Sequence, residues 1–408
     1  MGSEVRTRAT EPDRAAPPRP SAERPAADPF PEPAREPTCL ADPGPEAVPA
    51  RPTPSRTLAV MVGPSIDSRG GMATVARAYQ ASGLFGPGRV RYIQTVGGGG
   101  QLRKLAAAVS ALFRYLLVLL SGQAPVLHVL GASGASFYRK AAFIWLARLF
   151  RRRIVFHLHG GGFRDFVQRT RWPMRPLVER SMAAADVVLC LSSEMGDWLQ
   201  ASGLGRRVQV FPNPLPADAG AGQPLPCAQR DADILFLGGL TAAKGVDDLI
   251  RAFAPLAGRR AASRLLLAGT GERRRLEALA TDLGIADRCV FLGWIDGEQK
   301  RELMARAAVL ALPSYFEGQP MAILEAMAAG MGVVASRVGG IPDLCEDGRL
   351  AALVMPGAVE ALSAALDAAL ECDARVDAQV RQARAHVLSR HAGERVREAL
   401  IELYEELK

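Results

Sequence analysis

The stretch Leu312-Pro-Ser-Tyr-Phe-Glu-Gly-Gln-Pro-Met-Ala-Ile-Leu-Glu-Ala-Met-Ala-Ala-Gly330 has the pattern of a strand end, a loop and a helix. The apolar run 309–312 is typical of a strand that is buried on both faces of a parallel sheet. Pro320 suits the first position of a helix, where an N–H would have no partner, and Gly330 suits the residue after the helix. A helix that begins directly after a buried strand points its free N–H groups at the edge of the sheet, which favours phosphate binding.

Two carboxylates mark this unit. Glu317 lies in the loop and Glu325 about one and a half turns into the helix, so both can face the same crevice. Ionised carboxylates accept hydrogen bonds from hydroxyl groups, whereas a phosphate alone would not attract two acids. The pair therefore predicts a nucleotide sugar, with the diphosphate at the helix end, the ribose on Glu325 and the sugar on Glu317. The alternative is an amphipathic helix with solvated acids.

The residues 317–330, followed by Val333-Val-Ala-Ser336 and Gly339-Gly-Ile-Pro-Asp343, closely resemble the signature of the retaining family 4 glycosyltransferases. The resemblance covers roughly residues 56–408. It implies the α/β fold called GT-B, in which two Rossmann-like domains face each other across a cleft. It also implies an enzyme of class EC 2.4, of the hexosyltransferase type, that retains the anomeric configuration of the sugar.

The amino-acid composition of residues 1–56 differs from that of the rest of the chain. Residues 1–56 contain 14 of the 29 prolines, which predicts a disordered tail rich in Pro, Ala and Arg. From the composition and the resemblance we expect an acceptor-side N-terminal domain over 57–215, a linker over 216–232, a nucleotide-sugar-binding domain over 233–390, and a closing helix over 391–408 that crosses back to the N-terminal domain.

The net charge of +8 is unevenly spread. Residues 57–215 carry +14, whereas residues 216–408 carry −5. A basic N-terminal domain predicts an anionic partner, and we favour anionic lipid or a lipid-linked diphosphate acceptor. Nucleic acid is the rival partner, but the chain has no aromatic interleaving or binding motif that would support it. We therefore expect no nucleic-acid partner.

The sequence has no metal-binding pattern. Six cysteines are scattered, without a C-x-x-C pair, which predicts buried or incidental thiols in a reducing cytosol. Asp231-Ala-Asp233 is a D-x-D sequence, which binds a metal in another class of glycosyltransferases. Because it comes directly before an apolar strand, we interpret it as a solvated strand entry.

Two apolar stretches lie in the basic half of the chain. Residues 105–120 are shorter than the roughly 20 residues that span a bilayer, so they predict a helix packed on a sheet. Residues 137–150 predict a second apolar helix with arginines at its ends. Apolar and basic residues together suit an anionic membrane surface. We expect a cytoplasmic protein held peripherally at the inner face of the cell membrane.

A histidine pair lies on the strand 154–159. Alternation places His157 and His159 on one face, with His159 nearest the end where open α/β sheets bind ligands. The resembled family has a histidine close to the transferred sugar, and His159 matches it. His157 fits a structural role better. No third ligand accompanies the pair, so we do not expect a metal.

The first strand, 57–63, leads into a loop that contains Gly70 and Gly71. Glycines let a backbone approach a phosphate closely. In the resembled family the paired glycines lie against the donor diphosphate or the acceptor. The alternative is a tight turn with no ligand.

Lys244 follows the strand 234–237 and opens a helix, so it is well placed to neutralise a diphosphate. The sequence departs from the family pattern at Gly239, where an arginine is usual. Either Lys244 carries more of that charge or another cation substitutes for the arginine. This departure keeps a non-catalytic sugar-nucleotide-binding protein open as an alternative.

Together these features predict a retaining, metal-independent glycosyltransferase without a cofactor. It would move a sugar from a UDP- or GDP-sugar to a hydroxyl of a saccharide or lipid-linked oligosaccharide, in exopolysaccharide or other surface polysaccharide biosynthesis. A GT-B sugar-nucleotide epimerase is a further alternative. We predict that His159 and Glu317 are the catalytic residues, which would position the sugar. The donor-binding residues would be Gly70, Gly71, Lys244, Gly318, Gln319, Pro320, Met321 and Glu325.

Overall fold

The structure is a computed structural model that describes residues 57–95 and 101–408, with the side chains of 101–104 left aside. The tail predicted to be disordered, residues 1–56, lies outside the described residues.

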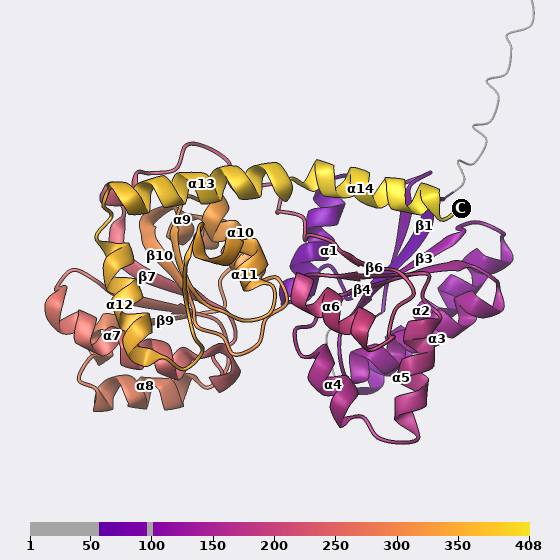
Figure 1. Ribbon diagram of the computed structural model, residues 1–408, viewed down its shortest axis with the longest axis horizontal. Helices are drawn as coiled ribbons and strands as arrows, with labels where there is room; N and C mark the ends of the chain where they lie inside the picture. Colours follow the sequence, from indigo (N-terminus) through magenta and orange to yellow (C-terminus); the bar gives the residue numbers. More distant parts are fainter. Residues whose placement is uncertain (1–56, 96–100) are drawn as a thin grey trace, which may run out of the picture. The chain divides into compact units, whose positions relative to one another are not determined.

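Six parallel strands form the N-terminal sheet, in the order β2-β1-β3-β4-β5-β6. The strands are β1 (Ala59–Gly63), β2 (Val90–Gln94), β3 (Val126–Gly131), β4 (Arg153–Leu158), β5 (Val187–Cys190) and β6 (Val208–Val210). The helices are α1 (Gly71–Ala81), α2 (Gln101–Leu120), α3 (Ala135–Leu149), α4 (Phe163–Arg169), α5 (Met174–Ala183) and α6 (Ser193–Ala201). Both faces of the sheet are covered by helices (Figure 1).

The two-residue period of β1 explains this layering. Ala59 and Met61 pack in one apolar cluster with residues of α1, whereas Val60 and Val62 pack in a second cluster with residues of α2 and α3. All four side chains are fully buried. A strand buried on both faces has to be apolar throughout, which is the pattern that predicted it.

Six parallel strands also form the C-terminal sheet, in the order β12-β11-β10-β7-β8-β9. The strands are β7 (Asp231–Leu237), β8 (Leu265–Ala268), β9 (Cys289–Gly293), β10 (Ala307–Leu312), β11 (Gly332–Ser336) and β12 (Ala352–Val354). The helices are α7 (Val246–Arg259), α8 (Arg273–Asp282), α9 (Gly297–Arg306), α10 (Met321–Ala328), α11 (Ile341–Leu344), α12 (Val359–Leu370) and α13 (Ala374–Arg390). Short 3₁₀ turns are Cys227–Gln229, Ala242–Lys244, Ala286–Arg288 and Glu346–Gly348. The predicted pair of Rossmann-like sheets is therefore confirmed.

The last helix, α14 (Gly393–Glu406), packs on α1 of the N-terminal sheet, whereas α13 packs on α10. Tyr404 of α14 is fully buried, and its hydroxyl lies 2.6 Å from Nδ1 of His128 on β3. Burial holds the pKa of Tyr404 well above its usual value, so the hydroxyl keeps its proton, and the tautomer of His128 sets which of the two groups donates.

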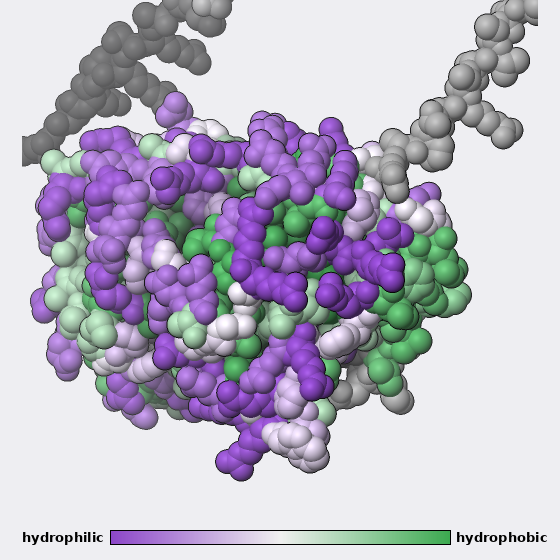
Figure 2. Space-filling model, turned by 45° about the vertical axis from the view of Figure 1, so that its right-hand side comes forward, coloured by the Kyte–Doolittle hydropathy of each residue, from purple (hydrophilic) through white to green (hydrophobic). Residues whose placement is uncertain are grey.

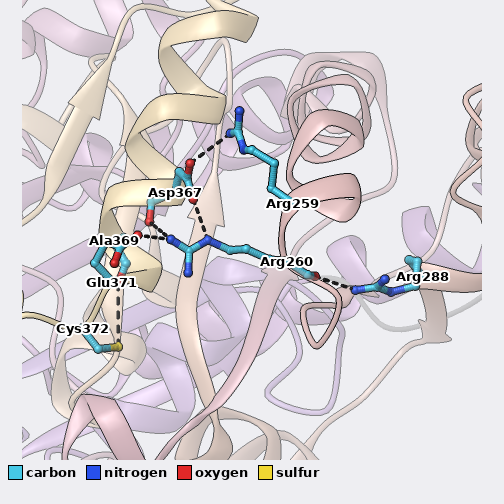
Figure 3. Close-up of polar contacts among 7 residues, drawn as sticks. All are labelled: Arg259, Arg260, Arg288, Asp367, Ala369, Glu371 and Cys372. Atoms are coloured by element: carbon cyan, nitrogen blue, oxygen red, sulfur yellow. Dashed lines mark hydrogen bonds and ion pairs between the residues drawn. The ribbon is translucent and has the colours of Figure 1, made fainter.

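Ion pairs join α7 to α12 on one face of the C-terminal sheet (Figure 3). Arg260 follows the end of α7, and its Nε donates to Oδ1 of Asp367 at 2.5 Å. Arg259 donates to the other carboxylate oxygen at 3.0 Å, and Glu371 also accepts from Arg260. The Arg260 side chain is 24% exposed, so this cluster is less screened by solvent than an isolated surface pair.

The interpretation of the D-x-D sequence as solvated is wrong for its second acid. The Asp233 side chain is only 4% exposed, and both of its oxygens accept hydrogen bonds from the guanidinium of Arg264, at 3.1 and 2.6 Å. A bidentate arginine can hold a buried carboxylate in its charged form without a metal ion. Asp231 is 39% exposed and pairs with Arg306, as expected of a strand entry.

The prediction that the cysteines are incidental is wrong for one pair. Cys227, in the turn before β7, forms a disulfide with Cys372, at the end of α12. Cys372 lies beside the ion-pair cluster in Figure 3. The disulfide closes a loop of 145 residues that contains every strand of the C-terminal sheet. Spacing in the sequence gives no sign of a pair that lies so far apart.

Reduction of this disulfide should lower the free energy of unfolding by about 2–4 kcal/mol, because the link restricts the unfolded chain. The measurement is the melting temperature with and without dithiothreitol. The Cys372→Ser variant should melt at the lower temperature under both conditions. An equal effect of dithiothreitol on the wild type and on the variant would contradict the disulfide.

Candidate functional site

The two sheets belong to one compact unit, and loops at the carboxyl ends of their strands enclose a cavity of about 400 Å³. This edge is where open parallel sheets bind ligands. All ten residues predicted for the site line this cavity. They are Gly70, Gly71, His159, Lys244, Glu317, Gly318, Gln319, Pro320, Met321 and Glu325. A larger cavity of about 1000 Å³ adjoins it and shares Trp294, Lys300 and Glu325.

Glu317 is held by two donors. Nζ of Lys244 lies 2.6 Å from Oε1 of Glu317, and the buried hydroxyl of Ser314 donates to the same oxygen at 2.8 Å. The Glu317 side chain is only 9% exposed. Gly245 holds the backbone in the left-handed region with φ of +66°, and a Cβ there would lie 2.0 Å from the Pro313 carbonyl oxygen. The glycine therefore lets the Lys244 turn approach the strand-end loop.

Glu325, on α10, is buried and pairs with a lysine that the sequence interpretation missed. Nζ of Lys300, on α9, lies 2.6 Å from Oε2 of Glu325. Burial raises the pKa of Glu325 above its usual value, and the charge of Lys300 opposes that shift. Lys300 stands among other charged residues on a polar helix, so no sequence pattern distinguishes it.

His159, just after β4, continues a row of histidines in which His157 and His128 are fully buried and His159 is partly exposed. Its ring centroid lies 4.1 Å from that of His157, which lies 5.4 Å from that of His128. Burial, together with the charge of Lys140, lowers the pKa of His159 to about 3, and a hydrogen bond to Asn213 opposes this shift. Burial also lowers the pKa of His128 to about 3. At neutral pH these rings are uncharged, so His159 can donate or accept a hydrogen bond but not supply a positive charge.

The helix after the donor loop begins one residue later than predicted. Pro320 is the residue before the first turn, with an extended backbone (φ −72°, ψ 122°), and the helix runs over Met321–Ala328. Asn213 explains the extended conformation. Its backbone N–H donates to Oε1 of Gln319 at 2.7 Å, and its side chain donates to the Gln319 carbonyl at 3.1 Å. No side chain caps the first turn of α10. The N–H groups of Ile323 and Leu324 donate to the Pro320 carbonyl, whereas those of Met321 and Ala322 remain available to a ligand.

Gly70 and Gly71, the glycine pair of the first loop, lie at the start of α1. Gly70 has a φ of +118°, which a residue with a side chain rarely adopts, and α1 begins at Gly71 without a side-chain cap. The neighbouring Arg69 lies over the ring of Trp294, with its guanidinium carbon 5.1 Å from the centroid. The free start of α1 therefore also faces the cavity.

Packing does not explain the glycine at position 239. A Cβ built there would have its nearest neighbours at 3.9 and 4.0 Å, which leaves room for a side chain. Among the described residues, the cavity is lined by three cations, Arg77, Lys244 and Lys300. Arg77 donates to the carbonyls of Ile66 and Ser68, and each lysine is paired with a glutamate. Within residues 57–95 and 101–408, no three His, Cys, Asp or Glu are grouped so as to hold a metal ion.

The chain matches two family descriptions that together cover most of the described residues. Residues 67–214 match the Glycosyl transferase 4-like domain, and residues 231–372 match the Glycosyl transferases group 1. The chain belongs to the group 1, family 4 glycosyltransferases. This membership confirms the predicted family, and with it the retaining class and the GT-B fold.

The related proteins match this glycosyltransferase over part of their lengths. An uncharacterized glycosyltransferase of Methanocaldococcus jannaschii is 43% identical over 112 residues, 27% of this chain and 28% of its own. The MMP alpha-(1->4)-mannosyltransferase of Mycolicibacterium hassiacum is 30% identical over 216 residues, 50% of this chain and 53% of its own. The chain therefore spans about half or less of the lengths of these relatives.

Solved structures share the fold over nearly the whole described chain. HepE of Anabaena in complex with UDP-glucose superposes with a TM-score of 0.67 at 20% identity, covering 86% of this chain and all of HepE. Sucrose-phosphate synthase of Thermosynechococcus elongatus gives 0.66 at 20% identity and covers 86% of this chain and 99% of its own. At this identity the likeness shows the GT-B fold.

Lys300 gives this glycosyltransferase a testable pH dependence. In Lys300→Met the pKa of Glu325 should rise further, because the charge that opposes burial is gone. Its carboxylate would then ionise only at higher pH, so a ligand affinity that depends on this carboxylate should be half lost at a higher pH. Lys300→Arg keeps the charge and should follow the wild-type profile. Calorimetric titration with UDP between pH 5 and 8 measures this, and superimposable Met and Arg profiles would contradict it.

Proposed function

We propose that this glycosyltransferase moves a hexosyl residue from a nucleotide diphospho-sugar to an acceptor hydroxyl. One arrangement supports the proposal: two carboxylates, each paired with a lysine at 2.6 Å, share a cavity with the free starts of α1 and α10. Carboxylates suit hydroxyls, and helix starts and lysines suit phosphates. A nucleotide sugar carries both kinds of group.

Different residues of the cavity would bind different parts of the donor. Glu325 would accept hydrogen bonds from the ribose, and Glu317 from the sugar. Lys244 and the starts of the two helices would stabilise the charge that develops on the leaving diphosphate. His159 is neutral and lines the cavity, so it would exchange a hydrogen bond with a sugar hydroxyl.

The proposed step assigns no covalent nucleophile and leaves both glutamates of the cavity, each paired with a lysine, to hold the donor. The acceptor oxygen forms a bond to the anomeric carbon, and the bond from that carbon to the diphosphate oxygen breaks. The hydroxyl proton passes to the leaving diphosphate. The new bond forms on the face that the diphosphate leaves, so the anomeric configuration is retained.

UDP-sugars are the first donors to test, because HepE, which shares the fold, was solved with UDP-glucose. GDP-sugars are the second. The acceptor we propose is a saccharide, in particular a lipid-linked oligosaccharide of surface polysaccharide biosynthesis at the inner face of the cell membrane. The basic N-terminal half of the chain supports an anionic acceptor or surface.

Helix α2 supports a membrane surface. The opposite face of the helix is buried on the sheet, and no described helix is long and apolar enough to cross a bilayer. Figure 2 shows apolar surface gathered at the right-hand edge of the view. Large apolar side chains that are 51–65% exposed recur every three or four residues, on one face of α2. They are Leu105, Val109, Phe113, Leu117 and Leu120.

A thermal-shift screen with UDP-, GDP-, ADP- and dTDP-sugars should show stabilisation by one base only. A donor at 100 times its Kd adds about 2.7 kcal/mol to the free energy of unfolding. Glu325→Ala should lose the shift, whereas Glu302→Ala, an exposed acid on α9, should keep it. Loss in both variants, or no shift in the folded wild type, would contradict the donor site. A product formed from the donor without any acceptor would indicate an epimerase instead.

Liposome sedimentation tests the membrane proposal. Vesicles with anionic lipid should bind the protein, and binding should weaken as salt rises from 0.05 to 0.5 M. Phe113→Ser with Leu117→Ser should reduce binding by about tenfold or more, since each change removes apolar area from the interface. Met355→Ser, at a residue 63% exposed beyond β12, is the matched control. Binding that is absent or insensitive to salt would remove the electrostatic argument.

A further inference from the structure

Two loops of the site meet backbone to backbone. A Cβ built on Gly161, in the loop after β4, would lie 2.3 Å from the Glu317 carbonyl oxygen. A Cβ built on Gly318 would lie 3.0 Å from the His159 carbonyl oxygen. Glycines on both sides therefore let the loop of the C-terminal sheet touch the loop of the N-terminal sheet, and the contact leaves no room for a methyl group at Gly161.

A second glycine pair, Gly339 and Gly340, also contacts the backbone of this loop. Cβ atoms built on Gly339 and Gly340 would lie 2.0 Å from the Glu317 oxygen and 2.4 Å from the Gly318 oxygen. The Gly340 N–H also donates to the Gly318 carbonyl at 2.8 Å. The donor loop, residues 317–319, is thus held between Gly339–Gly340 on one side and Gly161 on the other. Its position depends on both contacts.

Asp343 links the same two parts of the chain. This residue of α11 accepts a hydrogen bond from the backbone N–H of Ser193, the first residue of α6, at 2.5 Å. A carboxylate at the start of a helix is favoured by the helix dipole and by the charge on the acceptor. The link attaches the segment after Gly340 to the N-terminal sheet.

We propose that Gly161 and Asp343 are positioning residues that bring the donor loop onto His159 and so assemble the sugar site. The roles of His159 and Glu317 toward the sugar rest on the proposed function. The pair of Lys300 and Glu325, by contrast, lies on helices α9 and α10, outside the donor loop. Binding of the nucleotide moiety at Lys300 and Glu325 should therefore survive a disturbed contact, whereas transfer should not, because a shift of about 1 Å can slow a reaction by about 100-fold.

Gly161→Ala and Gly162→Ala form a matched pair. A Cβ on Gly162 would have no neighbour within 4 Å, and neither residue has a left-handed φ. Gly161→Ala should lower kcat by about 100-fold, with the Kd for the donor nucleotide within twofold of wild type and the melting temperature unchanged. Gly162→Ala should match the wild type in kcat, Kd and melting temperature. A wild-type kcat in Gly161→Ala, or an equal loss of kcat and nucleotide affinity, would overturn the proposal.

Asp343 is tested by rescue. Asp343→Asn keeps an oxygen that can accept the Ser193 N–H and should keep kcat within about threefold of wild type. Asp343→Ala removes the acceptor and should lower kcat by about tenfold while donor Kd stays unchanged. Equal kcat values for the Asn and Ala variants would remove Asp343 from the proposal.

Hydrogen exchange tests the contact between the two loops without a substrate, so it distinguishes a failure of this proposal from a failure of the proposed function. The amides of residues 191–195 and 317–319 should exchange faster in Gly161→Ala than in the wild type or in Gly162→Ala, whatever substrate is used. Unchanged exchange would overturn the positioning role of Gly161. Faster exchange in a protein that binds none of the nucleotide sugars would keep the contact and reject the proposed function.

Discussion

Nζ of Lys244 lies 2.6 Å from Glu317, and Nζ of Lys300 lies 2.6 Å from Glu325. These two pairs allow the side chains of Glu317 and Glu325 to be largely buried. A buried carboxylate without a partner would have a raised pKa and would lose its charge. Each pair also leaves donor and acceptor capacity unused, since an ammonium has three N–H groups and a carboxylate several lone pairs. The cavity can therefore receive a ligand that is itself both anionic and rich in hydroxyls.

The rest of the fold supports these pairs. Parallel strands buried on both faces bring loops from β1, β4, β7, β9 and β10 to the edges where the cavity lies. Gly245 lets the turn of Lys244 approach the loop before Glu317, and two hydrogen bonds from Asn213 hold Gln319 just before α10, which begins at Met321. Backbone conformation, more than side-chain variety, sets the geometry.

Much of this could be predicted from the sequence. Apolar runs of four to seven residues followed by glycine-rich loops gave the strands and the ligand edge, and the spacing of Glu317 and Glu325 pointed to one crevice. Partners from distant segments could not be predicted. No pattern in the sequence distinguishes Lys300 from the other charged residues of α9 as the partner of Glu325. The disulfide between Cys227 and Cys372 depends on the folding of the whole C-terminal sheet between them. Local sequence patterns cannot predict contacts between residues that are far apart in the chain until the topology is known.

The buried hydroxyl of Tyr404 has a consequence for the order in which the chain is made. Its partner, His128, belongs to the third strand of the N-terminal sheet, but Tyr404 is translated only after all of the C-terminal sheet. While the ribosome synthesises residues 231–392, the face of the N-terminal sheet that α14 will cover is still open. The first domain to emerge is thus the last to be completed, and its exposed apolar face has to be kept from other chains during that interval.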